Sequence, residues 1–167
     1  MDDELARLSA TLGAACRQHQ LTIATAESCT GGWVAQVITH TAGSSAWFER
    51  GFVTYSNLAK IDMLSVNRAT LDTHGAVSVE TALEMANGAL THSQAHISLA
   101  ITGIAGPGGG SPGKPVGTVC FAWCRANAPV ISETQCFPGD REAIRRQAVV
   151  HSLHGLLALL ETAKTVP

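Results

Sequence analysis

The order of strand-like and helix-like segments constrains the fold of this chain more than any other feature of its sequence. Early runs of β-branched and aromatic residues at 21–26 and 47–56 are each followed by a helical pattern, whereas three strand-like runs at 95–103, 115–124 and 129–136 follow one another. Alternation is typical of parallel strands joined by helices, and consecutive strands are typical of antiparallel ones. The sequence therefore predicts an α/β fold with a mixed sheet and helices on both of its faces.

Six helices are expected around these strands. The predicted segments are 3–19, 31–39, 57–64, 68–74, 79–92 and 141 to about 163. Asn67, Ser78 and Asp140 stand directly before the last three and are the predicted N-caps. The length of 167 residues suits a single domain over 1–167.

Composition excludes several classes of function. The net charge of −2 gives no basic footprint for nucleic acid or for a membrane surface. The acidic N-terminal stretch does not resemble a signal peptide, and no apolar run reaches the ~20 residues of a membrane span, so we expect a cytoplasmic protein. Only 14% of the residues are charged, which predicts that part of the surface is covered in a homodimer or higher homo-oligomer.

The five cysteines do not indicate a disulfide framework or a zinc site, because their number is odd and no C-x-x-C occurs. We expect ordinary core residues, with Cys120 and Cys124 on one face of a strand. Cys29 stands apart because it follows Ser28.

The stretch TAESCTGG (25–32) places Ser28 where a predicted strand turns into a helix. Unpaired N–H groups at a helix N-terminus can hold an anion or an oxyanion, and Gly31 and Gly32 allow close approach. The alternative is that Ser28 or Thr30 only caps the helix. The stretch is not the G-x-S-x-G elbow of α/β-hydrolases, because Ala26 and Thr30 replace the glycines.

A serine nucleophile requires a base. The seven histidines fall mostly on helix or loop positions and are interpreted as surface or capping residues. Of the three lysines, Lys60 in YSNLAK follows a predicted strand, while Lys164 lies at the C-terminal end. Burial would lower the pKa of Lys60 enough for it to act as a base, and the alternative is a solvated helix lysine.

The glycine-rich loop 103–114 contains a near match to the phosphate-binding P-loop. Gly108, Gly113 and Lys114 fit G-x-x-x-x-G-K, but Pro115 replaces the required Ser or Thr and a strand is predicted to follow. A nucleoside triphosphatase is therefore excluded, although backbone N–H groups of the loop can still surround a small anion.

Two arginines near the start of the last helix, Arg141 and Arg145, are four residues apart and share a helix face. They can grip a phosphate. The alternative is an ion pair with Asp140 or Glu142 on a solvated face.

Six segments together resemble the C-terminal domain of the CinA (competence/damage-inducible) family over about residues 4–155. They are TAESCTGGWVAQVIT, GSSAWFERGFVTYSNLAK, HGAVS, ITGIAGPGGG, KPVGTV and GDREAIRRQA. The resemblance implies a three-layer α/β/α domain with a mixed, mostly parallel sheet of about five strands. It also implies hydrolysis of nicotinamide mononucleotide (NMN) to nicotinate mononucleotide and ammonia in pyridine nucleotide salvage, without a metal or other cofactor.

Site roles follow from the same resemblance. Ser28 is expected to be the nucleophile, Lys60 the base and Tyr55 a hydrogen-bonding assistant. The expected substrate-binding residues are Thr30, Gly31, Gly32, Thr102, Gly103, Ala105, Gly106, Arg141 and Arg145. Two alternatives remain: a catalytically silent nucleotide-binding regulator linked to competence or DNA damage, and an amidase that uses Cys29.

Overall fold

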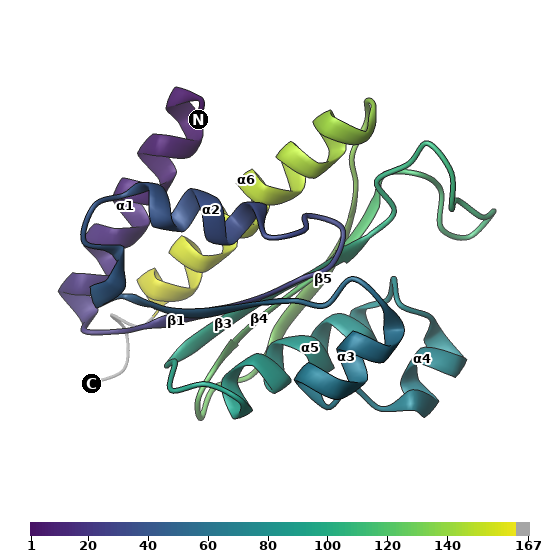
Figure 1. Ribbon diagram of the computed structural model, residues 1–167, viewed down its shortest axis with the longest axis horizontal. Coiled ribbons are helices and arrows are strands. Elements are labelled where there is room, and N and C mark those ends of the chain that lie inside the picture. The colour runs from purple at the N-terminus through teal and green to yellow at the C-terminus, as the bar shows by residue number, and fades with distance from the viewer. Residues whose placement is uncertain (163–167) are drawn as a thin grey trace.

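The computed structural model describes residues 1–162 and has three layers (Figure 1). Helices α1, α2 and α6 cover one face of a central sheet, and α3, α4 and α5 cover the other. The elements are α1 (Asp3–His19), β1 (Ile23–Glu27), α2 (Trp33–His40), the 3-10 turn η1 (Ser44–Ala46), β2 (Phe48–Val53), α3 (Asn57–Leu64), α4 (Arg68–His74), α5 (Val79–Thr91), β3 (Ile97–Gly103), β4 (Thr118–Arg125), β5 (Ile131–Cys136) and α6 (Arg141–Thr162). The expected order of elements is confirmed.

The sheet of the described residues has five strands in the order β2-β1-β3-β4-β5. Strand β1 pairs in parallel with β2 and β3, whereas β4 is antiparallel to both β3 and β5. Four strands therefore run in one direction and β4 runs against them, which confirms the mixed, mostly parallel sheet. The carboxyl ends of β1, β2 and β3 meet at one edge, where Glu27 is in register with Val53 and Ile101.

Alternate residues of the strands point to opposite faces of the sheet and pack into two separate hydrophobic cores. On β4, Phe121 and Trp123 join the core under α1, α2 and α6, whereas Cys120 and Cys124 join the core under α5. The prediction that these two cysteines share a face is confirmed. The expectation of a core position is wrong for Cys136, which is exposed at the end of the edge strand β5.

The predicted caps are largely confirmed. The Ser78 hydroxyl accepts a hydrogen bond from the Thr81 amide at 3.1 Å, and Asp140 accepts one from the Ala143 amide at 2.9 Å. Asn67 precedes α4 as predicted, but its side chain caps nothing. The predicted end of the last helix near 163 lies outside the described residues.

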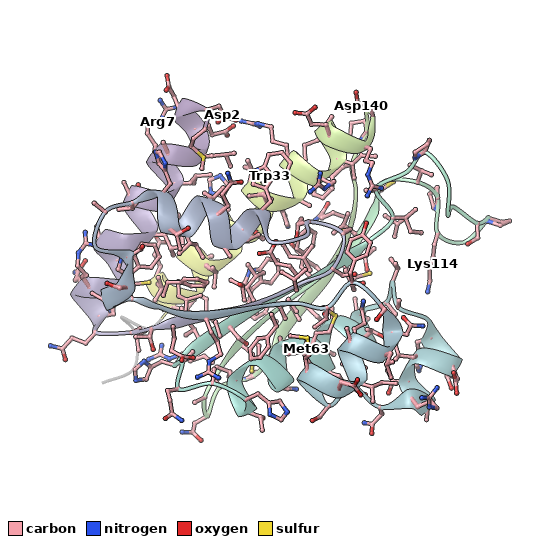
Figure 2. All side chains as sticks on the ribbon, viewed as in Figure 1. Asp2, Arg7, Trp33, Met63, Lys114 and Asp140 are labelled. Carbon is pink, nitrogen blue, oxygen red and sulfur yellow. The ribbon has the colours of Figure 1, made fainter. Side chains whose placement is uncertain are left out.

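The glycine-rich connection between β3 and β4 extends beyond the sheet as a long hairpin-like loop (Figures 1 and 2). It leads into a strand, as predicted, although β4 begins at Thr118 rather than Pro115. The Lys114 ammonium donates a hydrogen bond to the His74 carbonyl at 2.7 Å. Within residues 1–162, no helix has both the length and the apolar character needed to cross a membrane.

Candidate active site

Ser28 and Lys60 meet at the carboxyl edge of the sheet. Ser28 directly follows β1, and Lys60 lies in α3, on the opposite layer from α2. The Lys60 Nζ donates hydrogen bonds to Ser28 Oγ at 3.0 Å and to the Thr54 carbonyl at 2.8 Å. The Ser56 hydroxyl, which accepts from the Ala59 amide, caps α3 and fixes the turn that carries Lys60.

Lys60 is buried, with only 1% of its surface exposed, so its interpretation as a solvated helix lysine is wrong. Burial lowers the pKa of Lys60 from 10.5 to about 8. With that pKa, roughly a tenth of the lysine is uncharged at pH 7. Lys60 therefore has both the position and the basicity to take a proton from Ser28.

A cavity of about 240 Å³ surrounds this pair. It is lined by Ser28, Cys29, Tyr55, Asn57, Lys60, Ala76, Val77, Thr102, Gly103, Ala105 and Arg141. Most of these residues were expected from the sequence, but Asn57, Ala76 and Val77 were not, although all three lie in segments that resemble the CinA family. The hydroxyl of Thr102 donates to the Ala76 carbonyl at 2.7 Å, so it also fixes one wall of the cavity.

Glu27 is the residue that caps α2, so the alternative that Ser28 or Thr30 is only the helix cap is wrong. The Glu27 carboxylate is 1% exposed and accepts four hydrogen bonds of 2.6–3.1 Å, from the Thr30 hydroxyl and from the amides of Gly32, Val34 and Ala35. The helix N-terminus is thus occupied by an internal anion, and most of its amides are not available to a ligand.

Cys29 is unsuited to act as a nucleophile. Its side chain is only 7% exposed, and burial raises the pKa of its thiol to about 11. The reactive form of cysteine is the thiolate, which is scarce near neutral pH at such a pKa. The geometry therefore disfavours the alternative of a cysteine amidase.

Arg141 links the cavity to the glycine-rich loop rather than pairing with Asp140 or Glu142. It donates to the Gly106 carbonyl at 2.9 Å and to the Tyr55 hydroxyl at 3.0 Å. Tyr55 is 61% exposed. Its hydroxyl is bonded to Arg141, and the described residues show no hydrogen bond from it to Ser28 or Lys60.

Arg145 holds the turn that follows Ser28. Its guanidinium donates to the carbonyls of Cys29 and Thr30 at 3.0 and 3.1 Å, and it lies 5.3 Å from the centre of the Trp33 ring. It too makes no ion pair with Asp140 or Glu142 among the described residues.

A larger hollow of about 520 Å³ adjoins the Ser28 cavity, and Arg141 lines both. Its lining consists of Thr30, Gly31, Gly32, Trp33, Gln36, Arg141, Glu142 and Arg145. No histidine of the described residues lines either space. Residues 1–162 also contain no cluster of three or more His, Cys, Asp or Glu side chains that could hold a metal ion.

Comparison with known proteins identifies close relatives. The model of the CinA C-terminal domain family matches residues 5–160. A protein of Escherichia coli strain K12 named nicotinamide-nucleotide amidohydrolase PncC is 56% identical, over 93% of this chain and 94% of its own. A Pseudomonas putida protein of the same name is 49% identical, over 94% and 98%. The crystal structure of the competence/damage inducible protein CihA from Agrobacterium tumefaciens superposes with a TM-score of 0.93 at 46% identity, covering 95% of this chain and 97% of that one.

Proposed function

The chain belongs to the CinA C-terminal domain family, and from this membership and the geometry of its site we propose that it is a nicotinamide-nucleotide amidohydrolase. It converts NMN to nicotinate mononucleotide and ammonia. Two relatives that span nearly the whole chain carry the name of this activity. The observation that carries the proposal is the 3.0 Å contact between Lys60 Nζ and Ser28 Oγ within a cavity.

The mechanism uses the two residues in turn. Uncharged Lys60 takes the proton of Ser28, and Ser28 Oγ attacks the carboxamide carbon of NMN. Lys60 returns the proton to the nitrogen as the C–N bond breaks, and ammonia leaves an ester on Ser28. Water then attacks this ester, with Lys60 again as the base, and releases the carboxylate and free Ser28. The net reaction consumes one water and needs no metal.

The two adjoining spaces suit the two ends of NMN. The carboxamide occupies the cavity at Ser28, where Thr102, Gly103 and Ala105 form a wall. The phosphate extends toward the larger hollow, which Gly31 and Gly32 line. Arg141 lines both spaces, whereas Arg145 lines only the larger hollow, so Arg141 is the better candidate for the phosphate.

The experiment measures ammonia release from NMN by the EDTA-treated protein and by two variants. Ser28→Ala and Lys60→Ala are each expected to lose at least ~10³-fold in kcat, as removal of a nucleophile or its base does elsewhere. Lys114→Ala, in the projecting loop, is the matched control and keeps its activity. Activity that survives in Ser28→Ala refutes the mechanism, and activity lost only with EDTA refutes metal independence.

The second candidate is a silent nucleotide-binding regulator. The Ser28–Lys60 contact favours the enzyme, because a binding module needs no buried lysine against a serine. Calorimetric binding of NMN without ammonia release would support the regulator.

A role in pyridine nucleotide salvage and a homo-oligomeric state are parts of the same proposal. Sedimentation equilibrium tests the second, since one chain has a mass of 17.4 kDa.

A further inference from the structure

Most of the polar side chains that line the Ser28 cavity already have a hydrogen-bond partner within the protein. The Lys60 ammonium donates to Ser28 Oγ at 3.0 Å, and the guanidinium of Arg141 donates to the Tyr55 hydroxyl at 3.0 Å. The Thr102 hydroxyl donates to a backbone carbonyl at 2.7 Å. These groups are therefore committed to internal contacts before a substrate enters.

The side-chain amide of Asn57 is the exception. Asn57 lines the same cavity, and within residues 1–162 its side chain has no hydrogen-bond partner. A side-chain amide carries an acceptor oxygen and two N–H donors. Asn57 is exposed whereas Lys60 is buried, so Asn57 lies nearer the solvent. Its amide is therefore free to bind a ligand that enters the cavity.

Helix α3 places this amide on the same side of the cavity as the lysine. Asn57 and Lys60 are the first and fourth residues of α3, and residues three apart share one face of a helix. The Ser56 hydroxyl, which accepts from the Ala59 amide at 3.0 Å, holds the first turn. Since Lys60 reaches Ser28 from this face, Asn57 meets the cavity one turn earlier along it.

The proposed mechanism fixes which end of the carboxamide faces α3. Lys60 returns its proton to the leaving nitrogen, so the NH₂ group of the substrate must point toward α3. That group needs an acceptor. Lys60 and Arg141 have only donors, and no carboxylate of the described residues lines the cavity. The oxygen of Asn57 is an unused acceptor on the required side.

We propose that Asn57 is a specificity-determining residue that recognises the substrate as an amide, with its Oδ1 accepting a hydrogen bond from the carboxamide NH₂. This hydrogen bond strengthens as Lys60 protonates the nitrogen, because the donor then gains positive charge. An interaction that is stronger in the transition state raises kcat/KM. The inference rests on the proposed function and extends it to substrate choice.

The methyl ester of nicotinate mononucleotide is the probe, because it has no N–H at the leaving group. It reacts by the same steps: Ser28 Oγ bonds to the carbonyl carbon, methanol leaves with the proton from Lys60, and water releases the same acid. A residue that binds the NH₂ affects NMN alone. A residue that only supports Lys60, or that binds the carbonyl oxygen, affects amide and ester equally.

Asn57→Ala is expected to lower kcat/KM for NMN about tenfold, the size expected for one hydrogen bond to a group that gains charge, and to change kcat/KM for the ester less than twofold. Ammonia release measures the first and methanol release the second. Asn67→Ala is the matched control and keeps both values, because Asn67 also begins a helix, caps nothing and lies off the cavity. Equal losses for the two substrates in Asn57→Ala overturn the inference.

A second variant separates the acceptor of Asn57 from its donor. Asn57→Asp keeps an acceptor oxygen and removes the NH₂ group of the side chain. The added negative charge raises the pKa of Lys60, but both substrates use this base, so the effect cancels in the ratio of the two kcat/KM values. This ratio is expected to stay within about threefold of the parent. A ratio as low as that of Asn57→Ala shows that the donor is required and overturns the assigned role.

Failure of the function and failure of the inference give different results. A parent protein that releases no ammonia from NMN overturns the proposed function and the inference with it. An active parent whose preference for amide over ester is unchanged in Asn57→Ala overturns only the inference, and the roles of Ser28 and Lys60 stand.

Discussion

In the proposed mechanism Lys60 must lose its charge near neutral pH to act as a base. Burial favours this by making the ammonium form costly. No carboxylate of the described residues forms an ion pair with it, so burial dominates. The residue type and its proximity to Ser28 were expected from the resemblance to the CinA family. The burial was not, because the spacing in residues 57–64 is equally compatible with a solvated face.

The pH dependence of kcat/KM follows from this pKa. In the proposed mechanism the deprotonated form of Lys60 is the active base, and burial lowers its pKa to about 8. We therefore expect kcat/KM for NMN to rise about tenfold per pH unit below pH 7.5 and to level off above pH 9. The measurement is the initial rate of ammonia release between pH 6 and 10, at NMN concentrations well below KM. A rate that is flat between pH 6 and 8 would be incompatible with Lys60 as the base.

Substitution of Cys29, unlike that of Ser28 or Lys60, is expected to leave activity nearly unchanged. Its thiol is buried and burial raises its pKa to about 11. Cys29→Ala is expected to retain kcat within about threefold, with a loss of stability of about 1 kcal/mol from the missing buried sulfur. Ammonia release and thermal unfolding measure the two effects. A loss of activity comparable to that of Ser28→Ala would return the cysteine mechanism to consideration.

The roles of Glu27 and Arg145 could not be predicted from the sequence, because they depend on contacts formed in the folded protein. Glu27 is one acidic residue at the end of a strand, and nothing in the local pattern distinguishes a buried cap from a solvated carboxylate. Arg145 holds carbonyls that precede it by 115 and 116 residues, so its role depends on the packing of α6 against the turn after β1. From the sequence alone, an arginine near a helix N-terminus is expected to form an ion pair or to bind a ligand. Arg145 makes no ion pair among the described residues and instead donates to two backbone carbonyls.

Helices α3 and α5 pack closely against each other, and this packing sets the position of Lys60 because α3 carries it. Gly88 of α5 faces the last turn of α3, where a Cβ on residue 88 would lie 2.0 Å from the Leu64 carbonyl oxygen. Only a glycine permits this distance. The sequence predicted both helices from their apolar spacing, but a glycine inside a helix indicates only reduced propensity, and its packing role required the structure.

Gly88→Ala is therefore expected to push α3 away from α5. Overpacking of this kind costs about 1–3 kcal/mol in the free energy of unfolding. Because α3 carries Lys60, kcat is expected to fall about tenfold or more in protein that is still folded, since small displacements of catalytic groups are costly. Urea unfolding and ammonia release measure both. Gly108→Ala is the stability control, because a Cβ there has no neighbour within 4 Å. Equal stability of the two variants would contradict the argument.

At the scale of the whole molecule, the sequence predicted the class of sheet and the order of elements but not how they assemble the site. Strand β1 lies between β2 and β3, so the ends of three strands bring Ser28, Thr54 and Thr102 to one edge. Hydrophobic periodicity identifies strands without specifying their neighbours, because pairing depends on contacts distant in sequence. The hydrogen bond between Lys60 and Ser28 joins the two outer layers: Ser28 precedes α2 on one face, and α3 on the other face carries Lys60.

This assembly has a cost for the stability of the whole fold. A native pKa of about 8 against an ordinary value of 10.5 means that, between these pH values, the unfolded chain binds a proton that the folded chain does not. Stability therefore falls as the pH is lowered from 10.5 to 8, and the full penalty, about 3 kcal/mol, persists below pH 8. The fold carries this penalty at the pH where most enzymes work.

Lys60→Met removes the titrating group and keeps a long apolar side chain. At pH 7 the variant is expected to be inactive yet more stable than the parent by about 1–2 kcal/mol, because relief of the buried charge exceeds the loss of two hydrogen bonds. The difference in the free energy of unfolding should shrink as the pH rises from 8 to 10, because the unfolded parent chain then also loses the proton of Lys60. All other groups titrate in both proteins, so their contributions cancel in the difference. Urea unfolding at pH 7, 8.5 and 10, with equal m-values as the sign of comparable unfolding, measures the difference. A difference that stays constant over this range would mean that Lys60 keeps an ordinary pKa in the folded protein, and the general-base role would then lose its physical basis.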